Sequence, residues 1–109
     1  MAAPAKLTIT NNEKIYQYTK PKFTVTFYDE NDAETDPTTV TFKLRTASGT
    51  IYEYVNGTDS EVSTPSTGVY VLQALLDESG RTYIRAESDT TFGAAVDAYF
   101  DVVDSQFYS

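Results

Sequence analysis

The residues best suited to chemistry in this sequence are the acidic residues of the stretch 29–36, DENDAETD. Calcium prefers oxygen ligands, and an EF-hand loop supplies them at alternating positions with a glycine at the sixth. Here Ala33 occupies the fifth position and Glu34 the sixth, so the EF-hand pattern fails. Two interpretations stay open for this stretch: a calcium site of another type at the tip of a β-domain, and a solvated acidic loop.

The side chains that most enzymes use for catalysis are scarce. The 109 residues include no histidine and no cysteine, which removes the commonest proton shuttle, the thiol nucleophile, disulfides and Cys-ligated metals. Neither Gly-x-Ser-x-Gly nor Ser-x-x-Lys occurs, and glycine-rich phosphate loops are missing. A pair of carboxylates could cleave sugars, but the acidic residues are spread over loops and polar strand faces. We predict that the protein is not an enzyme and has no cofactor and no catalytic metal.

Tyrosines offer binding chemistry instead. Tyr52 and Tyr54 alternate along one segment and Tyr16 and Tyr18 along another, so each pair shares one face of a strand. Such a stripe can stack on sugar rings or form a protein interface, where tyrosine is enriched. One face of each strand in a two-layer sandwich belongs to the core, so core packing is the alternative interpretation of these rings.

Charge is unevenly distributed along the chain, whose formal net charge is −8. Residues 1–28 carry four lysines against one glutamate, a net charge of +3, whereas residues 29–109 carry four Lys and Arg against fifteen Asp and Glu, a net charge of −11. An acidic body repels phosphate backbones, which argues against nucleic acid as a partner. The basic N-terminal segment is a candidate for docking on an acidic surface.

No segment of the sequence suits a membrane. No run approaches the roughly twenty apolar residues that cross a bilayer, and residues 1–4 are too short and too weakly apolar for a signal peptide. We therefore expect no membrane partner, and a protein that stays in the cytoplasm where it is made or joins an assembly there.

The elements that position these residues are predicted to be strands. Apolar residues alternate with polar ones over residues 40–45, a Ser-Gly turn follows, and residues 51–55 alternate again, which predicts a β-hairpin. Residues 15–18 suit either a short edge strand or a linker. The polar segment 58–67 contains Pro65 and is typical of a loop. Further strands are predicted at 6–10, 23–28, 69–75, 81–87 and 94–103.

About seven strands without helical periodicity predict an all-β fold, a single immunoglobulin-like β-sandwich of about seven antiparallel strands, with a small barrel as the alternative. Tyr70 and Tyr83 each follow a glycine turn just inside a strand, like the corner tyrosine of such sandwiches, whose hydroxyl bonds the preceding loop to the strand. The alternative is that either residue is an ordinary strand aromatic. We divide the chain into an N-terminal arm or edge strand (1–20), the sandwich (21–103) and a C-terminal tail (104–109).

Several turn and strand motifs lie within residues 23–103: DPTTVTFKLR at 36–45, SGT at 48–50, NGTD at 56–59, STGVY at 66–70 and LDESG at 76–80. Together they resemble the motifs of small immunoglobulin-like structural proteins of tailed bacteriophages. Two positions depart from such sequences, because Ala47 stands where they often have proline and no tryptophan follows Gly80.

The resemblance implies a non-enzymatic virion protein, most plausibly an auxiliary protein that decorates or cements the outer surface of the capsid. Its partner would be the major capsid protein or another virion protein, and a homo-oligomer is compatible with this role. A neck or tail component and an exterior glycan-binding adhesin are the alternatives. The residues predicted to contact the shell are Lys6, Lys14, Tyr16, Tyr18, Lys20 and Lys22.

Overall fold

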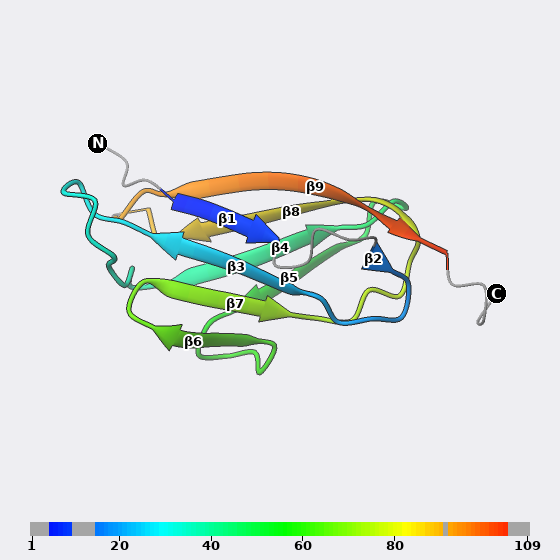
Figure 1. Ribbon diagram of the computed structural model, residues 1–109, viewed down its shortest axis with the longest axis horizontal. Helices are drawn as coiled ribbons and strands as arrows, with labels where there is room; N and C mark the ends of the chain where they lie inside the picture. Colours follow the sequence, from blue (N-terminus) through cyan, green and yellow to red (C-terminus); the bar gives the residue numbers. More distant parts are fainter. Residues whose placement is uncertain (1–4, 10–14, 91, 105–109) are drawn as a thin grey trace.

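Two β-sheets packed face to face make up the part of the chain that the computed structural model describes, namely residues 5–9 (backbone), 15–90 and 92–104 (Figure 1). Of the predicted tail at 104–109, residues 105–109 lie outside the described residues. The first sheet has the strand order β1 (Ala5–Ile9), β3 (Lys22–Phe27), β7 (Val69–Gln73), β6 (Val62–Ser66). The second sheet has the order β2 (Ile15–Tyr16), β9 (Ala95–Val103), β8 (Gly80–Ser88), β4 (Val40–Arg45), β5 (Ile51–Val55). None of the described residues forms a helix able to span a membrane.

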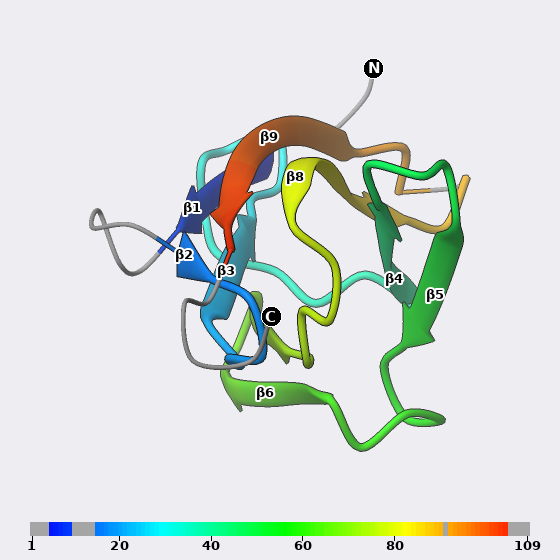
Figure 2. The ribbon, with the colours of Figure 1, turned by 90° about the vertical axis from the view of Figure 1, so that its right-hand side faces the viewer.

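The strand order is that of an immunoglobulin-like sandwich. The order β1-β3-β7-β6 corresponds to the ABED sheet, and β9-β8-β4-β5 corresponds to the GFC sheet with one added strand. Figure 2 looks along the strands, with β1, β3 and β6 on one side of the core and β8, β4 and β5 on the other. The predicted fold class is therefore confirmed. The described residues form nine strands instead of about seven, and β2 pairs in parallel with β9 while the other pairings are antiparallel.

Large aromatic side chains fill the space between the sheets. In β3 the alternation of apolar and threonine residues places Phe23, Val25 and Phe27 inward, where their side chains are fully buried. Phe23 stacks on Phe100 of β9 with 5.0 Å between ring centroids, so one ring pair joins the two sheets. These inward positions agree with the alternation in the sequence.

The edge strand β6 lies where the sequence predicted a loop, and that prediction is wrong. Val62 is buried and pairs with Leu72 of β7, but the register shifts between Ser63 and Ser66. Pro65 lies in this irregular part. Because proline has no N–H to donate, it is tolerated at bulges on edge strands, and it masks the strand in the sequence.

The hydroxyl of Tyr70 bonds a loop to its strand, but this loop is a distant one and not the preceding loop that was predicted. This hydroxyl donates a hydrogen bond of 3.0 Å to Asp36 Oδ1, and the amide of Gly68 donates one of 2.6 Å to the same oxygen. Asp36 belongs to the β3–β4 connection, so the tie joins that connection to the start of β7. Tyr83 is half-exposed and its ring lies beside that of Tyr99, so the corner role predicted for it is wrong.

Candidate functional site

The strand register arranges side chains in rows across the outer face of the five-stranded sheet. Alternate residues of β4 and β8 point into the core, so the residues between them face outward. Arg45 pairs with Ile51 on β5 and with Tyr83 on β8, and Tyr83 pairs with Tyr99 on β9. One row of large side chains therefore crosses four strands.

Two exposed tyrosines and an arginine form the centre of this face. Tyr83 is 50% exposed and Tyr99 is 58% exposed, and their ring centroids lie 6.1 Å apart. The guanidinium carbon of Arg81 lies 4.5 Å from the centroid of the Tyr99 ring, a cation–π contact. Arg81, Tyr83 and Tyr99 are called the Tyr–Arg patch below.

Ion pairs surround the Tyr–Arg patch. Lys43 Nζ lies 2.8 Å from Glu87 Oε1, and Arg85 Nη1 lies 2.9 Å from Asp97 Oδ2. The hydrogen bond and the charge of Glu87 raise the pKa of Lys43. Exposed pairs of this kind contribute little to stability, so their main effect is to neutralise the charge of the face.

All four Lys and Arg residues of the acidic part of the chain lie on this one face: Lys43, Arg45, Arg81 and Arg85. Four acidic residues share the face with them: Glu53, Glu87, Asp97 and Asp101. The formal charge of the face is zero, while the other eleven acidic residues of the range 29–109 lie elsewhere. The face is a neutral region on a strongly acidic body.

The sequence contains a pattern, not used in our prediction, that indicates which way these four cations face. The two cations of the segment 40–45 and the two of the segment 81–87 each occupy alternate positions, opposite to the apolar ones. Each pair must therefore face outward from its strand. What the sequence could not supply is that β4 and β8 are neighbours, which brings the two pairs together.

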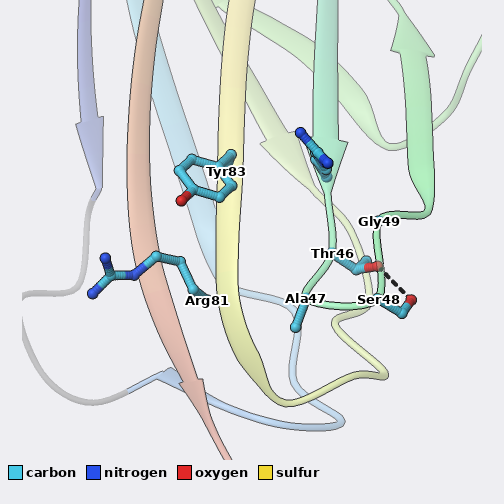
Figure 3. A pocket seen from close by; sticks show the side chains of 7 residues that line it. Thr46, Ala47, Ser48, Gly49, Arg81 and Tyr83 are labelled. Carbon is cyan, nitrogen blue, oxygen red and sulfur yellow. Dashed lines mark hydrogen bonds between the residues drawn. The ribbon is translucent and has the colours of Figure 1, made fainter.

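A shallow groove of about 420 Å³ adjoins the Tyr–Arg patch at the β4–β5 turn. Figure 3 shows Arg81 and Tyr83 on β8, at one side of the groove, and the residues of the turn at the other. Ser48 anchors the turn, because its amide and hydroxyl donate hydrogen bonds of 2.7 and 3.0 Å to the carboxylate of Glu78. Burial raises the pKa of Glu78, but hydrogen bonds from Thr46 and Ser48 outweigh it and lower that pKa overall. A carboxylate of lowered pKa is a poor general base for the neighbouring hydroxyl.

The structure brings four of the six predicted shell contacts together at one end of the sandwich. Tyr16 and Tyr18 are 46% and 43% exposed, and Lys20 and Lys22 are exposed as well. Tyr16 pairs with Val103 and faces outward at the β2 edge of the five-stranded sheet, because the preceding residue of β2 is buried. It therefore lies on the same outer face as the Tyr–Arg patch.

The other two predicted contacts are not placed with them. Lys6 lies on β1 opposite Thr26, four residues along β3 from Lys22, a separation of about 13 Å at 3.3 Å per residue. Lys14 lies outside the described residues.

Tyr18 has an unusual backbone conformation. Its φ is 68°, in the left-handed region that costs a non-glycine residue about 1–2 kcal/mol. Two hydrogen bonds to the β7–β8 connection hold it there: the Tyr18 amide donates to the carbonyl of Leu76 at 2.6 Å, and the Leu76 amide donates to the carbonyl of Thr19 at 3.0 Å. Backbone strain of this kind is concentrated at functional sites.

The predicted stripe formed by Tyr52 and Tyr54 does not exist as an exposed surface. Both residues lie opposite buried residues of β4, Leu44 and Phe42, and Tyr54 packs against the core. Tyr52 is 40% exposed because β5 is an edge strand. Core packing is thus the correct interpretation for Tyr54.

The acidic stretch 29–36 is organised by its own backbone. Asp29 Oδ1 accepts hydrogen bonds from the amides of Asn31 and Ala33, at 2.8 and 3.0 Å, and these bonds lower the pKa of Asp29. Within the described part of the chain, no group of three or more Asp, Glu, His or Cys residues is placed to hold a metal ion. The carboxylate of Asp29 shapes a turn.

Comparison with known proteins identifies a fold and no family. No family model and no curated protein matches the sequence. Among solved structures, the chain is similar to part of the chitinase ChiW from Paenibacillus sp. str. FPU-7, a bacterial cell-surface-expressed multi-modular enzyme, with a TM-score of 0.64 at 10% identity. That match covers 94% of this chain and 8% of the chitinase chain. At this identity the likeness shows a shared fold alone.

Two further structures have lower TM-scores. The chain is similar to the bacterial hydrophobin BslA with a TM-score of 0.46 at 16% identity, over 95% of this chain and 100% of that chain. It is similar to a conjugative transposon lipoprotein from Bacteroides eggerthii DSM 20697 with a TM-score of 0.42 at 12% identity, over 92% and 95% of the two chains.

Proposed function

We propose that this chain is a non-enzymatic structural protein of a tailed-phage virion, an auxiliary protein that attaches to the outer surface of the head through the outer face of its five-stranded sheet. The partner in this proposal is the major capsid protein. The immunoglobulin-like topology supports it, because the resemblance in the sequence is to small virion proteins of that fold.

The observation that carries the proposal is the Tyr–Arg patch on a neutral face. Tyrosine and arginine are enriched at the centres of protein interfaces and dominate their binding energy. The acidic remainder of the body suits contact with solvent, since a net charge far from zero favours solubility. Tyr16, one of the predicted shell contacts, lies on the same face as the patch, whereas Lys22 begins β3 in the other sheet.

Substituting the patch is the direct test of attachment. Heads assembled without this protein are mixed with the purified chain, and bound protein is measured by co-sedimentation. We expect Tyr83→Ser to weaken binding about thirtyfold, because interface hot spots cost about 2 kcal/mol when truncated. Val71→Ser is the matched control, because Val71 faces outward on the opposite sheet, and it should bind like the unmodified chain.

The substitution Tyr18→Gly tests whether the N-terminal segment contributes to head binding. Glycine tolerates the left-handed φ of this position, so the variant removes the exposed ring without adding strain to the backbone. We expect weaker head binding. Asp32→Gly is the control, because Asp32 has a φ of 62° in the acidic loop and its replacement should leave binding intact.

Failure of the unmodified chain to bind heads would refute attachment to the capsid. The number of copies per particle then decides among locations in the virion. A coat on the shell requires on the order of hundreds of copies, whereas a neck or tail ring contains as many copies as the order of its rotational symmetry.

A further inference from the structure

We propose that two copies of this chain join edge to edge through β5, which extends the five-stranded sheet of one copy into that of the other. The edge in question is the open side of the strand Ile51–Val55. β5 and β2 are opposite edges of the same sheet, so this contact leaves the end that carries Tyr16 and Tyr18 free. The inference does not depend on the proposed attachment to a virion.

Some backbone groups on the open side of β5 have no hydrogen-bond partner among the residues that the structure describes. The Asn56 amide donates to the Val40 carbonyl and the Thr46 amide donates to the Thr50 carbonyl, which fixes the alternation of the antiparallel ladder. In this alternation the peptide groups of Ile51, Glu53 and Val55 point away from β4, toward the open edge.

Only some of the peptide groups on that edge have hydrogen-bond partners among the described residues. The Val55 amide donates to Asp59 Oδ2 at 2.7 Å, and the Val55 carbonyl accepts from the amides of Thr58 and Asp59. The N–H and C=O groups of Ile51 and Glu53 have no partner within the described part of the chain and are available for pairing with another strand.

The composition of β5 protects this edge only weakly. Its sequence IYEYV has no proline and no lysine, Glu53 is its single charged residue, and Ile51 and Tyr52 are 61% and 40% exposed. In natural proteins, proline, bulges or charged residues normally prevent edge strands from pairing with another chain. The edge strand of the other sheet, β6, shows this protection, since it contains Pro65 and a register shift.

A second copy fits this edge in one register. Two-fold symmetric antiparallel pairing that centres on Tyr52 sets Ile51 of each copy opposite Glu53 of the other. Each of these two pairs exchanges both of its N–H···O=C bonds, and the Tyr52 rings meet at the axis in a close, non-hydrogen-bonded pair. A register centred on Glu53 would oppose two carboxylates, which is unfavourable.

Charge complementarity favours the same register. Arg45 and Glu53 form no ion pair with any residue that the structure describes, although both lie on the outer face. Arg45 neighbours Ile51 on one side, and pairing places Glu53 of the second copy on the other side of Ile51. The backbones of the two charged residues are two strands apart, at about 4.8 Å for each strand spacing. The long arginine side chain can therefore reach over Ile51 to the carboxylate.

The first experiment measures mass against protein concentration by analytical ultracentrifugation, for the unmodified chain and two substitutions of Glu53. We expect a monomer–dimer equilibrium that Glu53→Pro weakens at least about tenfold, since proline removes the outward N–H without breaking the β4 ladder. Glu53→Gln retains the N–H and should preserve most of the dimer. A chain that is monomeric up to millimolar concentration, or one that forms open polymers, would overturn the proposal.

The second experiment uses the absence of cysteine from the chain. Tyr52→Cys introduces one thiol at the symmetry axis, where Cα atoms of a non-hydrogen-bonded pair lie about 4.5 Å apart, within disulfide range. We expect mild oxidation to give a covalent dimer. Tyr83→Cys, on the exposed outer face, should stay monomeric under the same conditions. Equal cross-linking of both variants, or none of Tyr52→Cys, would contradict pairing through β5.

Discussion

Replacing Gly68 by alanine is expected to destabilise the protein on the order of 3 kcal/mol, equivalent to roughly 15 °C in melting temperature for a domain of this size. Gly68 has a φ of +77°, which costs an alanine about 1–2 kcal/mol. An added Cβ would also lie 2.8 Å from the Thr35 amide nitrogen and 3.0 Å from the Phe27 carbonyl oxygen. Both atoms belong to backbone groups that hydrogen-bond to each other at 3.0 Å, so neither can move away without breaking a bond.

Gly57→Ala is the matched control for this prediction. Gly57 has a φ of +87° and an added Cβ there meets nothing within 4 Å, so it reports the cost of the left-handed conformation alone. We expect Gly68→Ala to lose clearly more free energy of unfolding than Gly57→Ala in urea titrations. Equal losses would mean that the contact with the β3–β4 connection is not rigid.

The central strands could be predicted from the sequence because their signal is local. In β3 and β4 every second residue is apolar, and each of those residues is buried in the structure. Alternation of this kind depends on neighbours along the chain and on one buried face, so it survives without knowledge of the partner strands.

The edges of the sheets could not be predicted equally well. β6 buries only Val62, and its remaining residues are polar or proline, so no alternation marks it. It becomes a strand because β7 offers a free edge, which is a tertiary effect. The two residues of β2 likewise carry too little pattern to separate an edge strand from a linker.

The candidate site depended on contacts between distant segments. The outward direction of Lys43 and Arg85 followed from alternation, but the row that joins Arg45, Tyr83 and Tyr99 exists only because β4, β8 and β9 are neighbours in register. Sequence reasoning placed the binding surface in the N-terminal segment because the net charge is positive there. The structure shows in addition a neutral face with exposed tyrosines, which net charge along the chain does not reveal.

The buried hydrogen bond from Tyr70 to Asp36 predicts a loss of stability at alkaline pH. Tyr70 is 3% exposed, and burial together with the hydrogen bond to Asp36 and its charge raises the pKa of Tyr70 to about 12. In the unfolded chain a tyrosine titrates near 10. The folded protein therefore holds this proton more tightly, and the resulting stabilisation is complete below pH 10 and is lost as the pH rises from about 10 to about 12.

We expect this loss to be about 2–3 kcal/mol, at 1.36 kcal/mol for each unit of pKa difference. Tyr70→Phe removes the titrating group, so the difference in unfolding free energy between the unmodified chain and the variant should shrink across that pH window. Urea titrations at pH 8, 10, 11 and 12 measure this difference. The ionisation of the other tyrosines does not contribute to it, because both proteins contain them. Parallel curves would contradict the prediction, because they would mean that Tyr70 ionises in the folded protein as easily as in the unfolded chain.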